Sequence, residues 1–199
     1  MNLTLRVPVM MLLLAWGAAC AQAQSQTPLT RTGQLVVAGQ PVRYLIRHLP
    51  VSSFPALPAV VVQHLNRRGC SIPQTYEAHR PENVVHASLE RAGSSDWAVL
   101  CSSGDTVSLL VFFGSGGEPA VLATALETDR LQAHDLTGVL GFNWGIDPAT
   151  PEQVHQAQSG LDPRPVRLDH DALADAVVDR KTVYRFFVHD AWTLVAMPG

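Results

Sequence analysis

The strongest pattern of apolar and polar residues runs from Asp96 to Phe113, where two apolar runs are separated by Ser-Ser-Gly-Asp. This pattern predicts a β-hairpin. Alternate residues of a strand point to opposite faces of a sheet. In the first run, one face carries Trp97, Val99 and Cys101, and the other carries Ala98 and Leu100. Because both faces are apolar, we expect the hairpin to lie in the middle of a sheet.

Other segments with strand-like patterns lie on both sides of this hairpin. Val84–Glu90 directly precedes it, so that Val84–Phe113 is predicted to form a three-stranded antiparallel meander. Apolar alternation also predicts an N-terminal hairpin, a single strand and a C-terminal hairpin. Their ranges are residues 35–37 with 42–47, residues 139–146, and residues 182–188 with 192–197.

Helices are predicted at three places. Pro58–Arg68 has an apolar stripe, and Gly69 is placed to end this helix in the left-handed conformation. Thr150-Pro151-Glu152-Gln153 is a capping box that begins a short helix reaching about Gln158. Asp169–Asp179 has an acidic start, which suits the positive end of a helix dipole, and apolar residues at helical spacing.

Together these elements predict an α+β fold. We expect one domain over residues 33–197, with an antiparallel sheet and two or three short helices packed on one side. Residues 71–82 are expected to form a loop, and residues 119–132 a mixture of helix and strand. Residues 24–32 are polar and are expected to form a mobile lead.

Residues 1–23 have the pattern of a secretory signal peptide. Arg6 precedes a short apolar run, and Ala21-Gln22-Ala23 is an A-x-A cleavage site. We therefore expect a protein exported by a bacterium, either periplasmic or secreted, with no transmembrane segment in the mature chain. Cys20 follows small residues and leaves an alternative open, namely a lipoprotein anchored to the membrane through Cys20.

Two cysteines, Cys70 and Cys101, remain once the leader is removed. An even pair in an oxidising compartment predicts a disulfide bond. Cys70 comes just after the first expected helix and Cys101 lies on the central strand, so the bond would fix the helix end to the hairpin. The alternative is two separate buried thiols.

Charge and motifs restrict the classes of partner. The formal net charge is −3, and no basic run is longer than Arg67-Arg68, which argues against a nucleic-acid-binding protein. No cofactor or metal is predicted, because the chain contains no G-x-S-x-G, HExxH or CxxC motif. The expected partner is another envelope protein or a small ligand.

Asp169-His170-Asp171 is the densest group of metal-ligating or acid–base side chains. Neighbouring side chains on a helix diverge by about 100°, so at most two of the three can share one ion. One interpretation is local: an aspartate caps the helix and His170 is exposed or hydrogen-bonded nearby. The other interpretation is a metal or general-base site completed by His155 or His189.

Three segments resemble the landmarks of an uncharacterised group of exported bacterial proteins of unknown function. The segments are Cys70-Ser71-Ile72-Pro73-Gln74, Ser95-Asp96-Trp97-Ala98-Val99-Leu100-Cys101 and Asp169-His170-Asp171-Ala172. The resemblance covers about Cys70–Trp192. It implies that these landmarks belong to one domain, and it implies no activity.

Two classes of function follow from these observations. The absence of a catalytic motif favours a non-catalytic secreted or periplasmic protein that binds a ligand or another component of the bacterial envelope. The alternative is a small exported hydrolase, with or without a metal, that uses Asp169, His170 and Asp171. The hydrolase requires these side chains to converge with another histidine or carboxylate inside a cleft, and the binding protein does not.

Overall fold

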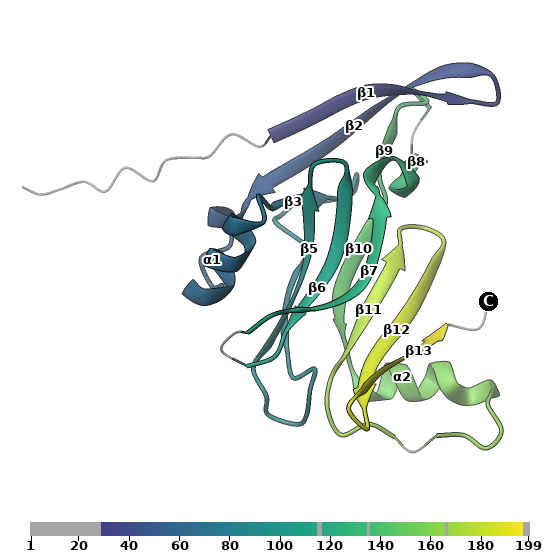
Figure 1. The fold of residues 1–199 in the computed structure, drawn as a ribbon. Coiled ribbons are helices and arrows are strands. Elements are labelled where there is room, and N and C mark those ends of the chain that lie inside the picture. The colour runs from purple at the N-terminus through teal and green to yellow at the C-terminus, as the bar shows by residue number, and fades with distance from the viewer. Residues whose placement is uncertain (1–28, 115–116, 135, 166, 197–199) are drawn as a thin grey trace, which may run out of the picture.

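The computed structural model describes residues 29–114, 117–134, 136–165 and 167–196. Within these residues the chain forms thirteen β-strands in two sheets, two α-helices and three short 3-10 helices (Figure 1). The predicted α+β fold, with one sheet and its helices on one side, is therefore wrong, because the structure is predominantly β. The predicted leader, its cleavage site and Cys20 lie outside the described residues.

The first sheet has nine strands in the order β7-β6-β5-β3-β2-β9-β8, with β1 paired to β2 and β4 paired to β5. The bounds are β1 (Leu29–Val37), β2 (Gln40–Pro50), β3 (Ser71–Gln74), β4 (Val84–Ala87), β5 (Asp96–Ser103), β6 (Thr106–Phe112), β7 (Ala120–Leu126), β8 (Leu131–Ala133) and β9 (Leu140–Phe142). The pairing of β2 with β9 is parallel and the other pairings are antiparallel. This sheet confirms the predicted N-terminal hairpin and the meander β4-β5-β6. The hairpin already begins at Leu29, within the segment expected to be a mobile lead.

The second sheet has four antiparallel strands in sequence order. They are β10 (Trp144–Ala149), β11 (Ala172–Val177), β12 (Lys181–Val188) and β13 (Ala191–Ala196). Strands β12 and β13 confirm the predicted C-terminal hairpin. Strand β11 shows that the predicted helix Asp169–Asp179 is wrong. It pairs with β10 on one side and β12 on the other, and this pairing outweighs the helix preference of its alanines.

Three other expectations need correction. The expected loop 71–82 contains β3, which pairs with β2 and β5. Residues 119–132 resolve into β7, a 3-10 helix at Glu127–Arg130 and the start of β8. The single strand expected at 139–146 is divided at Asn143 into β9 and β10, which belong to different sheets.

The two sheets pack face to face, and each outer face is covered by one helix. Ala98 and Leu100 of β5 pack with Trp144 and Leu173 of the second sheet in the central core. On the other face of β5, Trp97, Val99 and Cys101 pack against helix α1 (Ala59–Arg67). Helix α2 (Pro151–Ala157) packs on the outer face of the second sheet, against Ala172, Tyr184 and Phe186. The predicted alternation of β5 is confirmed, and its two faces serve two cores.

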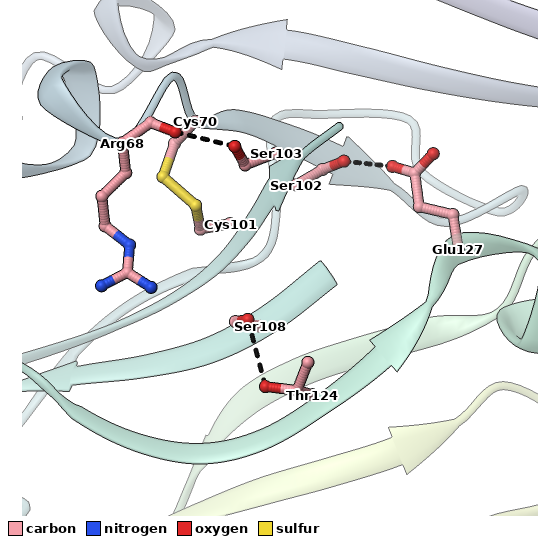
Figure 2. The surroundings of a disulfide bond; sticks show 8 residues. All are labelled: Arg68, Cys70, Cys101, Ser102, Ser103, Ser108, Thr124 and Glu127. Atoms are coloured by element: carbon pink, nitrogen blue, oxygen red, sulfur yellow. Dashed lines mark hydrogen bonds between the residues drawn. A yellow bond between two sulfur atoms is a disulfide. The ribbon is translucent and has the colours of Figure 1, made fainter. Parts of the chain in front are cut away.

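The end of α1 is fixed to the first sheet as the sequence predicted. Gly69 has a φ of +68°, and the backbone N–H of Cys70 donates to the carbonyl of Leu65 at 3.0 Å, which closes the helix end. Cys70 and Cys101 form a disulfide bond with their Cα atoms 5.1 Å apart. Figure 2 shows this bond beside a second link, in which the Ser103 hydroxyl donates to the carbonyl of Arg68 at 2.7 Å. Both cysteines are buried.

Candidate functional site

The segment Asp169-His170-Asp171 lies directly before β11 and is not helical. Its side chains consequently point in different directions. The Asp169 side chain is 83% exposed and that of His170 is 7% exposed. Asp171 is half-buried and bonds to residue 88: its N–H donates to the Ser88 carbonyl at 2.9 Å, and its carboxylate accepts from the Ser88 N–H at 3.1 Å.

His170 is held by two acceptors. Its Nε2 donates to the Phe187 carbonyl at 2.9 Å, and its Nδ1 lies 2.8 Å from the Asp169 carboxylate. Neither partner can donate, so each ring nitrogen faces a hydrogen-bond acceptor of the protein. The hydrogen bond from His170 lowers the pKa of Asp169 below its usual value. Both ring nitrogens of His170 are therefore engaged within the protein.

Two neighbouring hollows meet at this histidine and share Asp169, His170, Val188 and His189. The larger hollow is about 550 Å³, and we call it the His170 cleft. It is lined by Gln158, Pro165, Arg167, Leu168, Asp169, His170, Phe186, Val188 and His189. The smaller hollow, about 430 Å³, also contains Glu90, Arg91, Phe187 and Asp190.

The structure therefore brings His189 to Asp169 and His170, whereas Asp171 is tied to Ser88 and His155 does not line either hollow. Within the described residues, no group of three or more His, Cys, Asp or Glu side chains is arranged to hold a metal ion. The three candidate residues do not converge as one catalytic or metal-binding group.

The wall of the His170 cleft combines apolar and polar groups that the sequence pattern did not identify. Leu168, Phe186 and Val188 provide apolar surface. Gln158 is 2% exposed, and its buried Oε1 has no hydrogen-bond partner among the described residues. Arg167 forms an ion pair with Glu152 at 2.7 Å, and both side chains are about half exposed. A cleft of this size and composition can bury much of a small organic ligand.

A second group of ionisable residues surrounds the buried carboxylate of Glu127, and we call it the Glu127 cluster. Glu127 Oε1 accepts hydrogen bonds from His48 Nε2 at 2.7 Å and from the Ser102 hydroxyl, which is also drawn in Figure 2. Its Oε2 accepts from Arg31 Nη1 at 2.9 Å, and Arg31 also pairs with Asp105. The cluster joins β1, β2, β5 and the turn after β7.

Two opposing effects act on the pKa of Glu127. Burial raises the pKa, whereas the hydrogen bonds from His48 and Ser102 and the positive charge of Arg31 lower it. Burial is the largest single effect, but the lowering effects together outweigh it, so the pKa of Glu127 lies below its ordinary value and the carboxylate is ionised at neutral pH. The Ser102 hydroxyl donates to Glu127 and not to His48, so Ser102 and His48 do not form a nucleophile–base pair. This cluster fastens β1 to the sheet.

A further cavity, of about 350 Å³, lies beside β2 and β9. Tyr76 and His134 stack at its edge with ring centroids 4.6 Å apart. Two of its polar lining residues already have partners within the protein. Arg47 donates to the Ala78 carbonyl, and the side-chain amide of Gln74 bonds to the Ile72 carbonyl and to the backbone N–H and carbonyl of Glu82. The His170 cleft is larger, and one of its lining residues, Gln158, has a buried amide oxygen without a partner among the described residues, so this cleft is the better candidate for a ligand site.

Comparison of the chain with protein-family models, curated proteins and solved structures found no match. The resemblance to a group of exported bacterial proteins stays a prediction. Among the helices of the described residues, none is long and apolar enough to cross a membrane.

Proposed function

We propose that this chain is an exported, non-catalytic binding protein, periplasmic or secreted, that holds a small organic anion in the His170 cleft. The observation that carries the proposal is the composition of the cleft wall. Apolar Leu168, Phe186 and Val188 lie beside the guanidinium of Arg167 and the ring of His170. An apolar body and an anionic group on one ligand match these two parts of the wall.

Asp169 is paired with His170 at 2.8 Å and Glu152 with Arg167 at 2.7 Å. The Arg167 side chain is 56% exposed and its guanidinium has five N–H donors, so the pair with Glu152 leaves donors for an anionic ligand. Gln158, whose buried Oε1 has no hydrogen-bond partner among the described residues, also lines this cleft. A concave site of about 550 Å³ suits a small molecule better than the flat surface of another envelope protein.

A binding function is favoured over a hydrolase by the hydrogen bonds of Asp169, His170 and Asp171. Both nitrogens of His170 are used by acceptors, and Asp171 is turned to Ser88. A general base needs a lone pair within reach of the proton that it removes. The arrangement of Asp169, His170 and Asp171 therefore supports a positioning role in a ligand site rather than a catalytic one.

The proposal of export is supported by the leader pattern and by the buried disulfide, since stable disulfides are typical of oxidising compartments. If Cys20 carries a lipid instead of leaving with the leader, the same domain is held at a membrane surface. The ligand site is the same in both cases.

The proposal is tested with two fluorescent probes, anilinonaphthalene sulfonate and the uncharged N-phenylnaphthylamine. We expect the sulfonate to bind the protein without its leader, residues 1–23, with a rise in fluorescence, and Arg167→Ala to weaken this binding about tenfold, as expected for the loss of one charge-assisted contact. Arg167→Lys keeps the charge and should retain most of the affinity. Arg43→Ala, on the exposed side of β2, is the control and should have no effect.

The neutral probe separates the two parts of the proposal. It should bind through the apolar wall and be insensitive to Arg167→Ala. If the sulfonate binds with equal affinity to the Arg167→Ala protein, the preference for anions is wrong. If neither probe binds the unmodified protein, the cleft is not a ligand site and the proposed function is overturned.

A further inference from the structure

Within the described residues, the outer edge of β1 is an unpaired strand edge, which can bind another strand. Strand β1 pairs with β2 along its whole length, from Leu29 opposite His48 to Val37 opposite Gln40. Within the described residues it pairs with no strand on its other side. Figure 1 shows the β1–β2 hairpin running across one end of the molecule and extending beyond the other strands.

The turn of this hairpin determines which backbone groups face the open edge. Ala38 and Gly39 both have positive φ, as in a two-residue type I′ turn, so the flanking pair Val37 and Gln40 is hydrogen-bonded. Hydrogen-bonded and non-hydrogen-bonded pairs then alternate along the strand. The residues that direct their N–H and C=O groups away from β2 are Thr30, Thr32, Gln34 and Val36.

This edge lacks the usual protection against pairing. Strand β1 contains no proline and no lysine, and its register with β2 has no bulge. Its one charged residue, Arg31, is used inside its own chain by Glu127 and Asp105. A nine-residue strand of this kind is a template for another strand.

We propose that two copies of this chain pair antiparallel through β1, around a twofold axis at Gly33. In this register Thr32 lies opposite Gln34 and Thr30 lies opposite Val36, each twice. These four residues are the ones whose backbone groups face outward, so every outward N–H and C=O finds a partner. The two first sheets then continue across the dimer as one sheet.

The side chains also match in this register. Leu29, 61% exposed, lies opposite Val37, 46% exposed, at both ends of the interface. Arg31 lies opposite Leu35, so no like charges face each other. Gly33 meets Gly33 at the axis, where the chain has no room for a side chain: a Cβ on Gly33 would lie 2.5 Å from the hydroxyl of Tyr44.

The contact is small. Two strand edges of this length bury roughly 800 Å² in total, below the size of most stable interfaces and within the range of reversible ones. We therefore expect a weak and reversible dimer. This inference does not depend on the His170 cleft.

Sedimentation velocity of the full-length protein at increasing concentration tests the existence of the dimer, and paired charges test the register. The double variant Thr32→Lys/Gln34→Lys places lysine opposite lysine at two points, and should raise the dimer Kd at least tenfold. The double variant Thr32→Lys/Gln34→Glu places lysine opposite glutamate at the same points, and should restore association to within about threefold of the unmodified protein. Both side chains are exposed, so both variants should keep the fold, which far-UV circular dichroism checks.

The corresponding edge of the second sheet supplies the control. Strand β13 also follows a turn with two positive φ values, at His189 and Asp190. By the same alternation, the backbone N–H and C=O of Leu194 point to the outer edge of β13. Leu194→Pro should leave the dimer intact, whereas Thr32→Pro should abolish it. A monomer at all concentrations, a dimer that Leu194→Pro disrupts, or equal Kd values for the two double variants would each overturn the proposal.

Discussion

Asp96 and Glu127 are both buried carboxylates, and different kinds of groups hold them. Asp96 is fully buried and accepts hydrogen bonds from the backbone N–H groups of Leu89, Glu90 and Gly114, each at 2.8 Å, and from the Ser94 hydroxyl. Glu127 is held by Arg31 and His48 as well as by a hydroxyl. The backbone bonds to Asp96 fix the position of a loop. The groups around Glu127 make the free energy of unfolding depend on pH.

The free energy of unfolding should fall in acid because of Glu127. Its pKa in the folded protein is below the unfolded value of 4.5, so its contribution is fully present above pH 4.5 and is lost as the pH falls through the folded pKa. Glu127→Gln should be less stable at pH 7 and should show a flatter dependence below pH 4.5. Urea denaturation between pH 7 and acid measures both effects.

Asp105→Asn is the matched control, because Asp105 binds the same arginine but its side chain is 76% exposed. Exposed ion pairs contribute little, so this variant should keep the acid dependence of the unmodified protein. Equal flattening in both variants would show that the exposed carboxylate of Asp105 contributes as much to the acid dependence as the buried Glu127.

The sequence allowed the disulfide to be predicted but not the Glu127 cluster. Two cysteines after a leader leave one pairing, whereas His48 and Arg31 lie 79 and 96 residues from Glu127 and are candidates among many. One signal was available: His48 continues the inward alternation of Tyr44 and Ile46 on β2, which marks it as a buried histidine in need of a partner.

Strand β9 shows how a short element depends on one small residue. It has three residues, and Gly141 lies beneath the stacked rings of Tyr76 and His134. A Cβ on Gly141 would lie 2.5 Å from the Cβ of Tyr76 and 3.0 Å from the His134 ring. The segment after β3 can approach β9 only because this side chain is absent.

Gly141→Ala should therefore lower the free energy of unfolding by about 2 kcal/mol, as overpacking does. Gly145→Ala, four residues later, is the matched control, since its Cβ would lie 3.6 Å from the nearest atom, on Thr75, which is ordinary contact. Its effect should be within about 0.5 kcal/mol. Urea denaturation of the two variants at neutral pH measures the difference, and equal effects would show that Tyr76 moves aside without cost.

Local sequence signals predicted both α-helices but did not predict strand β11. Helix α2 has the predicted capping box, with hydrogen bonds in both directions between Thr150 and Gln153. Residues 172–177 have apolar positions at helical spacing and alanines that favour helix, but they receive their hydrogen bonds from two neighbouring strands. A window of the sequence does not contain those neighbours.

The two sheets are joined by Asn83, which has a φ of +69° and is 2% exposed. Its amide nitrogen donates to the carbonyls of Pro73 at 2.7 Å and Trp144 at 3.2 Å, and its side-chain oxygen accepts from the N–H of Ile146 at 3.0 Å. One side chain thus bonds to β3 in the first sheet and to β10 in the second.

Asn83→Gly should destabilise the whole molecule by about 3 kcal/mol, because buried backbone groups in both sheets lose their partners. Glycine tolerates the positive φ, so backbone strain does not contribute. Asp190→Gly replaces an exposed residue with a φ of +60° and should change stability by less than about 0.5 kcal/mol. Thermal unfolding followed by circular dichroism compares them, and similar melting temperatures would contradict the role of Asn83.

The division into two sheets was not predictable from the pattern of residues 139–146. The apolar alternation runs through Asn143 without a break, yet the chain leaves the first sheet there and enters the second. The backbone N–H of Asn143 donates to the Arg130 carbonyl, and the Asn143 carbonyl accepts from the N–H of Val178. These contacts come from distant segments, so the sequence predicted many strands correctly but not their distribution between sheets.

The parallel pairing of β2 with β9 joins two segments that are synthesised far apart in time. Tyr44 lies opposite Leu140, so a chain growing from its N-terminus completes β2 long before the ribosome has added the strand that covers this edge. During that interval β3 can cover only residues 47–50 of this edge, and Tyr44 and Leu45 stay uncovered. A nascent or truncated chain that ends before Leu140 therefore leaves Tyr44 and Leu45 without their partner strand, and such an open edge favours aggregation.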